Sequence, residues 1–167
     1  MRTITKLIVA VSVAVILIFA GVMIVWKVAE SKTLLPDHAP TDVEENAVID
    51  NADSEKMDIP PNGGGASFNY AKEITIDMST GTAELYFENS GSALYDASLV
   101  LVIDDTVILE SGLLPPGSCL TTLSFPKDSL PLQRGGYDAA LWVQSYDEDG
   151  NALNVNFQLQ GIRVEVK

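Results

Sequence analysis

The most apolar stretch of the chain lies near its N-terminus, where residues 7–26 read LIVAVSVAVILIFAGVMIVW and contain no charge. A helix rises about 1.5 Å per residue, so a helix from Leu7 to Trp26 would span roughly 30 Å, the thickness of a bilayer's hydrocarbon core. The pattern predicts one transmembrane helix, preceded by a short head of residues 1–6. A short head and a long following domain favour a cytoplasmic N-terminus and an extracellular C-terminal domain in the cell membrane.

A cleaved signal peptide is the alternative interpretation of this stretch. Signal peptides carry an apolar region of about 7–15 residues, followed by a small-x-small cleavage site. The apolar run is longer here, and the nearest candidate site ends at Ala29 and places Lys27 where a small residue is required. An uncleaved anchor is therefore favoured.

Ala10, Ala14 and Gly21 fall on one face of the predicted helix. Small residues at such spacing let two membrane helices approach closely, which would allow a homodimer. Because Ala and Gly are common in membrane helices in any case, dimerisation through this face is the less favoured interpretation.

From residue 72 to the C-terminus, apolar and polar residues alternate with the period of two that is typical of β-strands. The alternating runs cover residues 72–78, 82–88, 94–103, 106–110, 118–125, 137–146 and 153–166, and turn-forming residues separate them. About seven short strands with turns every 8–12 residues are typical of an immunoglobulin-like fold. We predict an all-β domain over residues 72–167, a single immunoglobulin-like antiparallel β-sandwich, with a small barrel as the alternative.

Two of these runs carry irregularities. In residues 94–103 the odd-numbered positions are apolar, but Val100 and Val102 make the other face apolar too. This indicates a central strand, or a second face covered by the preceding chain or by a partner. In the last run the apolar positions change from odd to even numbers after Gly161. An extra residue near Gln160 and Gly161 restores the alternation, so we predict a β-bulge there.

Composition separates residues 27–71 from both neighbours. Between Glu30 and Asp58 there are nine acidic residues, two lysines and few large apolar residues, and a Pro-Pro-Asn-Gly-Gly-Gly run follows. Such a composition is typical of a solvated, self-repelling chain. We therefore predict a disordered linker between the membrane and the sandwich. The glycine run lacks the preceding strand and following helix of a phosphate-binding loop.

The net charge of the chain is −13, and residues 30–167 alone carry −16. A surface this acidic repels nucleic acids and anionic lipid head groups, so we expect no nucleic-acid partner. The lipid bilayer is expected as a partner only through residues 7–26.

Catalytic chemistry finds little support in the sequence. The only histidine, His38, lies in the predicted linker, where general acid–base chemistry has no rigid frame. The only cysteine, Cys119, has no histidine in the domain to activate it, and its strand alternation places it on the inner face as a buried thiol. Zinc sites need several Cys or His ligands. We therefore predict no catalytic residue, no cofactor and no enzymatic activity.

One loop offers a candidate metal site. Asp147, Asp149 and Asn151 supply oxygen atoms of the kind that calcium prefers. The loop lacks the spacing of an EF-hand, and Asp-Gly-Asn is ordinary hairpin chemistry. A structural turn is therefore favoured over a calcium site.

Three aromatic residues, Tyr86, Trp142 and Tyr146, lie by parity on outward faces or on the second sheet. Flat aromatic side chains on a sandwich face stack on sugars or anchor a protein partner, which makes these three the candidate partner-binding residues. Packing within the core is the alternative and the favoured interpretation.

The order of the turn signals resembles that of a known kind of module. Four signals follow one another: Asn89-x-Gly91, the hairpin of residues 99–107, Gly112-Leu113-x-Pro115-x-Gly117 and Gly136-Tyr137. In this order they resemble adhesion-related CARDB-type bacterial immunoglobulin-like modules. The layout of the whole chain is similar to that of small single-pass surface proteins of Gram-positive bacteria. The resemblance covers about residues 72–167 and implies a fold and a cell-surface location, but no chemistry.

Together these features predict a membrane-anchored, extracellular, non-catalytic binding or accessory module of a bacterial cell envelope. Contact with another envelope protein within a larger assembly is the favoured role. Binding of a glycan, as in an adhesion module, and a purely structural spacer are the alternatives.

Overall fold

The structure, a computed structural model, describes residues 35–50, 52–58, 65–127 and 129–167. The predicted head, the predicted transmembrane helix from Leu7 to Trp26 and the small residues Ala10, Ala14 and Gly21 lie outside the described residues. Within the described part, no helix is long and apolar enough to cross a membrane.

The described chain is all-β. Its strands are β1 (Ala47–Ile49), β2 (Phe68–Tyr70), β3 (Glu73–Asp77), β4 (Thr82–Asn89), β5 (Asp96–Ile103), β6 (Thr106–Glu110), β7 (Ser118–Ser124), β8 (Gly135–Tyr146) and β9 (Ala152–Val166). They form one sheet in the order β1-β7-β4-β3-β9-β8-β5-β6, and β2 pairs with β4 beside β3. The prediction of an all-β fold is confirmed, and the seven predicted strands correspond to β3–β9.

The prediction that every strand pair is antiparallel is wrong. β3 and β9 run parallel, with Glu73 opposite Arg163 and Ile76 opposite Val166. Two backbone bonds extend this pair, from Arg163 N to the carbonyl of Lys72 (2.7 Å) and from the C-terminal Lys167 N to the carbonyl of Ile76 (2.9 Å). Period-two alternation sets the face that each side chain takes, but it carries no information about the direction of the neighbouring strand.

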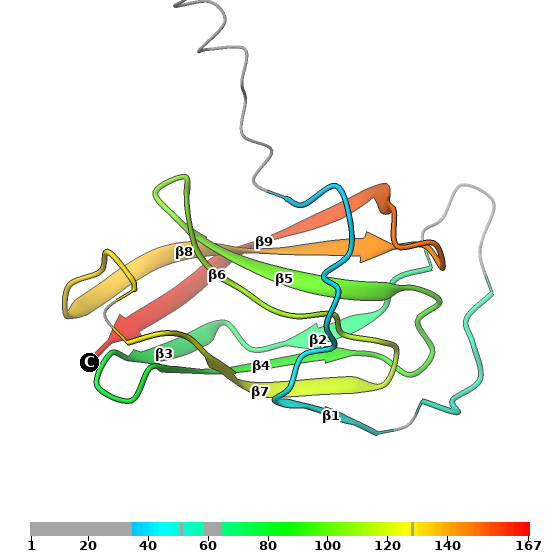
Figure 1. The fold of residues 1–167 in the computed structure, drawn as a ribbon, viewed down its shortest axis with the longest axis horizontal. Helices are drawn as coiled ribbons and strands as arrows, with labels where there is room; N and C mark the ends of the chain where they lie inside the picture. Colours follow the sequence, from blue (N-terminus) through cyan, green and yellow to red (C-terminus); the bar gives the residue numbers. More distant parts are fainter. Residues whose placement is uncertain (1–34, 51, 59–64, 128) are drawn as a thin grey trace, which may run out of the picture. The chain divides into compact units, whose positions relative to one another are not determined.

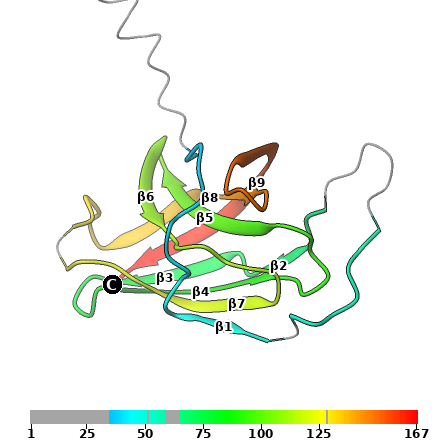
Figure 2. The same cartoon turned by 45° about the vertical axis from the view of Figure 1, so that its right-hand side comes forward.

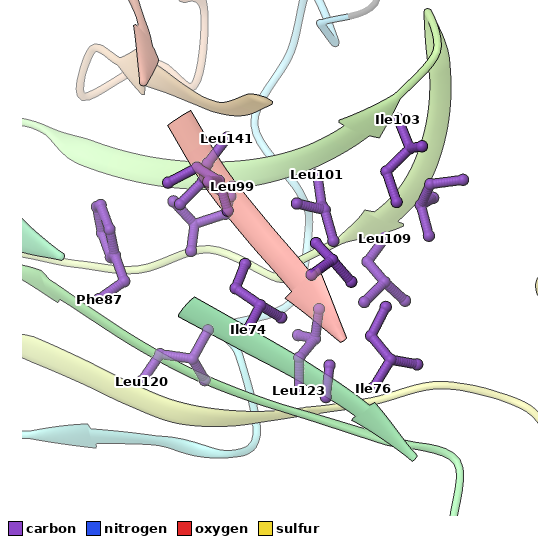
Figure 3. Packing of buried hydrophobic residues seen from close by; sticks show 14 of the residues in the cluster. Ile74, Ile76, Phe87, Leu99, Leu101, Ile103, Leu109, Leu120, Leu123 and Leu141 are labelled. Carbon is purple, nitrogen blue, oxygen red and sulfur yellow. The ribbon is translucent and has the colours of Figure 1, made fainter. Parts of the chain in front are cut away.

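The sheet curls over, so that β1, β7, β4 and β3 face β6, β5 and β8 (Figures 1 and 2). β9 lies at the fold of the sheet, because it pairs with β8 along its length and with β3 through residues 163–166. The core fills the space between the two layers, and Figure 3 shows leucine, isoleucine and phenylalanine side chains from six strands pointing toward one another. Each of these side chains, when fully buried, stabilises the fold by about 1.5–3 kcal/mol.

The predicted bulge near Gly161 is confirmed. Between β8 and β9, Ala139 pairs with Ile162 and Leu141 pairs with Leu159, so β9 carries one extra residue. Gly161 has a φ of 73°, which a residue with a Cβ rarely adopts. The bulge keeps Ile162 in the core although the apolar residues before it are odd-numbered.

The predicted hairpin after Ile103 is also confirmed. Ile103 pairs with Thr106, and Asp104 and Asp105 have φ values of 48° and 57°. Positive φ at both central residues is the geometry of a type I′ turn, for which aspartate is among the favoured residues. The hairpin therefore ends in two exposed carboxylates.

The prediction of a disordered linker over residues 27–71 is wrong for the described part of that range. Residues 35–50, here called the strap, run along the domain and include β1, which pairs with β7. The strap first meets the β8–β9 turn, where Ala39 N donates to the carbonyl of Gly150 (2.9 Å) and Ala152 N donates to that of Asp37 (3.0 Å). Composition suggested disorder because the strap has few apolar side chains, but backbone hydrogen bonds hold it.

The strap then passes the β6–β7 connection. Glu44 N donates to the carbonyl of Leu113 (2.9 Å), Leu113 N donates to that of Asp42 (2.9 Å), and Gly112 N donates to the Glu44 carboxylate (2.7 Å). A Cβ on Gly112 would lie 2.8 Å from Glu44 N, so only glycine admits the strap at this distance. The same connection bonds to β5, through Ala97 and Leu114, so the strap and the connection together link the two edges of the curled sheet.

Candidate binding groove

The outer face of the layer formed by β5, β8 and β9 carries the candidate site. Across these strands Val100, Trp142 and Gln158 form one row, because Val100 pairs with Trp142 and Trp142 with Gln158. The next row begins with Val102 opposite Ala140. Sequence alternation predicted that Val100, Val102 and Trp142 avoid the core face, and the register confirms it.

One end of this outer face is closed. Tyr146 is 1% exposed, and its hydroxyl shares a hydrogen bond of 2.8 Å with the hydroxyl of Ser98, which is also buried. Gln144 is buried nearby and donates to the carbonyls of Ser145 and Leu153. The start of the strap is bonded to the β8–β9 turn that adjoins this end (Figure 1).

Tyr146 is therefore not an exposed aromatic, which agrees with the favoured interpretation of burial and removes it from the candidate partner-binding residues. Burial raises the pKa of its phenol above the usual value of 10.0, and the bond to Ser98 acts in the opposite direction. Parity placed Tyr146 correctly on the outer face, but it gave no sign that this end of the face is covered.

The other end of the outer face is open and forms a groove of about 450 Å³. Side chains of the β5–β6 turn, β8 and β9 surround it, in the set Val102, Asp104, Asp105, Asp138, Ala139, Ala140, Trp142, Gln158, Gln160 and Gly161. Figure 2 shows the β5–β6 hairpin rising on one side of this layer. The volume falls within the range of about 300–1,000 Å³ that is typical of ligand sites.

Trp142 is the only aromatic residue among those that line the groove, and it is partly exposed. Gln158 and Gln160 are exposed, and neither amide makes a hydrogen bond to another described residue. Gln160 lies two residues beyond Gln158 on β9, so strand alternation places both amides on the same face, and both line the groove. The groove thus combines an apolar surface with two amides that both donate and accept hydrogen bonds.

The rim of the groove is acidic. Asp104 and Asp105 lie on the hairpin turn and are exposed. Asp138 lies 3.7 Å from Arg163, and both of these side chains are largely solvated, at 93% and 75% exposure. Exposed ion pairs contribute about 0–1 kcal/mol, so this pair holds neither side chain firmly. No lysine or histidine lines the groove.

Tyr86 lies far from Trp142 in the sheet order, on the outer face of β4, and is 40% exposed. Its hydroxyl donates to Glu88 (3.1 Å), and this bond raises the pKa of the phenol. Val48 of β1 is 66% exposed on the same outer face, two strands away, with Cys119 of β7 directly opposite it. Tyr86 is thus the exposed aromatic residue that was predicted, but the structure does not bring it together with Trp142.

Cys119 is partly exposed and lies on the outer face, so its predicted burial is wrong. Between β4 and β7 the register shifts between Glu84 and Phe87, where β4 carries an extra residue. Leu120, fully buried, takes the inner position instead. The buried leucines of β7, Leu120 and Leu123, are three residues apart, so they do not share the parity on which the prediction for Cys119 relied.

The predicted calcium ligands form a turn. The Asp147 carboxylate accepts hydrogen bonds from Asn151 N (2.8 Å), Asp149 N (3.0 Å) and the Asn151 amide. The Asn151 backbone bond in particular lowers the pKa of Asp147. Among the described residues, no three His, Cys, Asp or Glu side chains gather as a metal site would require. The oxygens of Asp147 are engaged in the turn, as the favoured interpretation expected.

Sequence reasoning missed Gln158, Gln160 and the three aspartates of the rim as parts of one site. Parity of β9 places Gln158 away from the core, so the signal existed, but only the pairing of β9 with β8 brings it beside Trp142. No family model, curated protein or solved structure matches this chain.

Proposed function

We propose that this chain is a membrane-anchored, non-catalytic binding module displayed outside a bacterial cell, and that its groove around Trp142 binds the partner. The proposal includes the finer description of the fold as an immunoglobulin-like sandwich. The observation that carries it is the groove itself, an open hollow with a partly exposed tryptophan and two amides that make no hydrogen bond to another described residue. The uncharged run of residues 7–26 supports the anchor, and the short head before it and the long domain after it support the orientation.

The lining supports binding rather than catalysis. It contains no histidine, cysteine, serine or lysine, the residue types that most often act as nucleophile or base. Its carboxylates are the exposed aspartates of the rim, which face water rather than an enclosed site. Such a groove holds a ligand by contact and hydrogen bonding.

A protein partner on the opposite layer is the second candidate. Val48 and Tyr86 share the outer face of β1, β7 and β4, and Ile49 next to Val48 is 52% exposed. Exposed apolar and aromatic side chains on one face are common at protein interfaces. This face would serve the role of an accessory protein in an envelope assembly.

Retention on cell-envelope fragments from the source bacterium tests the proposal. The full chain in detergent is compared with Trp142→Ala, and Tyr86→Ala is the matched control because it removes an exposed aromatic from the other layer. We expect at least tenfold weaker retention for Trp142→Ala and no change for Tyr86→Ala. Circular dichroism establishes that each variant is folded.

Two other results would overturn the proposal that the groove binds the partner. Loss of retention in Val48→Asp and Tyr86→Ala, with Trp142→Ala unchanged, would move the function to the second candidate. Equal retention of all variants, or none for the wild type, would leave the chain as a structural spacer.

A further inference from the structure

The chemistry of the groove also indicates the class of its ligand. We propose that the groove binds a neutral oligosaccharide chain. The inference rests on the proposed function, and it adds the ligand class that the function leaves open.

The tryptophan supplies the first requirement. A sugar ring has a face of C–H groups that packs on an aromatic ring, and a bound sugar needs such an apolar platform because its hydroxyls alone exchange hydrogen bonds with water. Trp142 lies in the row between Val100 and Gln158, so it is held on the central strand of the layer rather than on a loop. A rigid platform loses little conformational entropy when the ligand binds.

The amides supply the second requirement. A hydroxyl group both donates and accepts a hydrogen bond, and an amide does the same, whereas a carboxylate only accepts and an ammonium only donates. Gln158 is directly opposite Trp142, and Gln160 lies two residues along the same strand. Both amides make no bond to another described residue, so a ligand hydroxyl displaces only water from them.

The charge of the rim excludes one class of sugar. Asp104, Asp105 and Asp138 are the ionisable residues that line the groove, and all three are acidic. Uronic acids, sialic acids and sulfated sugars would meet repulsion from these carboxylates, because the three acids outnumber the cation beside them, Arg163, which lies 3.7 Å from Asp138. Vicinal hydroxyls of a neutral sugar, by contrast, donate well to an exposed carboxylate.

The same geometry favours a sugar over a basic peptide. An acidic rim attracts lysine and arginine, and a cation over a tryptophan gains about 0.5–2 kcal/mol. However, the polar groups on the strand beside Trp142 are neutral amides, and the carboxylates lie on the rim, where solvent and salt screen them. The rim aspartates therefore select against anionic ligands, and the amides next to Trp142 can exchange hydrogen bonds with the hydroxyls of a sugar.

Binding to an array of defined ligands tests the ligand class. The full chain in detergent is probed with neutral oligosaccharides of glucose, galactose, mannose and N-acetylglucosamine, with their sulfated and uronic counterparts, and with Lys/Arg peptides. We expect binding to at least one neutral chain, and at least tenfold weaker binding to its anionic counterparts. Trp142→Ala and Gln158→Ala should each weaken that binding, and Trp142→Phe should restore part of it.

The controls separate the ligand class from the groove. Tyr86→Ala should bind like the wild type, and Gln158→Ala tests the site without removing an apolar side chain that helps the fold. If only Lys/Arg peptides bind, and Trp142→Ala abolishes that binding, the proposal of a sugar ligand is overturned but the groove remains the binding site. If sugar binding survives in both Trp142→Ala and Gln158→Ala, the groove is not the binding site. If no ligand on the array binds, the proposed ligand class is wrong.

Discussion

Replacing Gly112 by alanine tests whether the strap is an integral part of the domain. A Cβ at this position would lie 2.8 Å from Glu44 N and 2.9 Å from the carbonyl oxygen of Asp42, both backbone atoms of the strap. Backbone cannot rotate away as a flexible side chain can, so the strap must shift or detach. Gly136→Ala is the matched control, because its Cβ would make only ordinary contacts, with the Glu165 side chain at 3.5 Å and the Val164 carbonyl oxygen at 4.0 Å.

The strap can respond to the added Cβ by detaching or by staying in place under strain, and the response that costs less free energy sets the loss of stability. Detachment would lose two backbone hydrogen bonds, at about 1 kcal/mol each, and the bond from Gly112 N to the Glu44 carboxylate, at about 2 kcal/mol. Keeping the strap in place costs about 1–3 kcal/mol, the usual range for overpacking. We therefore expect Gly112→Ala to lower the free energy of unfolding by about 1–3 kcal/mol relative to Gly136→Ala.

Thermal unfolding of the full chain in detergent, followed by circular dichroism, measures this difference. For a domain of this size about 3–5 °C of Tm correspond to 1 kcal/mol, so a decrease of about 3–15 °C is expected. A glutamate-specific protease should also cut faster after Glu44 and Glu45 in Gly112→Ala. If both glycine variants melt together and are cut at the same rate, the strap does not contribute to the fold as described.

Three further predictions concern a buried amide, a turn carboxylate and the bulge. Asn89→Ala should lower the free energy of unfolding by about 1–3 kcal/mol in urea titration, because the buried Asn89 amide donates two hydrogen bonds, to the carbonyls of Leu114 (2.8 Å) and Tyr95 (3.0 Å), and both would be lost; a loss no larger than that of an exposed asparagine would contradict this. The Ser79 hydroxyl at 2.6 Å and the Ser79 and Thr80 amides lower the pKa of Asp77 below 3.8, so its contribution to stability is present above pH 3.8 and is lost as the pH falls through the lowered value. Asp77→Asn should therefore flatten the acid side of the stability profile, and an unchanged profile would refute the role of this turn. Gly161→Ala should lower Tm by several degrees while Gly161→Asn is milder, because asparagine tolerates a φ of 73° better than alanine does; equal melting of the two variants would contradict the assigned strain.

The strand segments were predictable because their causes are local. Alternation over β3, β4, β5 and β8 placed the core residues correctly, and the change of parity after Gly161 revealed the bulge before any strand pairing was known. Asp104 and Asp105 favour positive φ by their own chemistry, so the hairpin was readable as well. In each case the information lies within a few residues of the feature.

The misplaced residues have causes that lie elsewhere in the chain. Cys119 was assigned to the core because the extra residue that shifts its register belongs to β4. Tyr146 was kept as a candidate partner-binding residue beside the favoured interpretation of burial, because alternation does not show that its end of the face is closed in the folded domain. The strap was taken for a free linker because its composition is polar, and the carbonyls and amides that hold it belong to residues 112–117 and 150–152.

By itself the sequence determined an all-β domain, its turns, the core faces of most strands and its acidic charge, since each depends on local pattern or composition; the membrane anchor stays a prediction. Only the tertiary structure decided that β3 and β9 run parallel, that the strap links the two edges of the sheet, and that Trp142, Gln158, Gln160 and the rim aspartates share one groove. Period-two alternation assigns each side chain to a face but does not say which strand lies beside it. The groove is built from three strands, and so it exists only once their register is set.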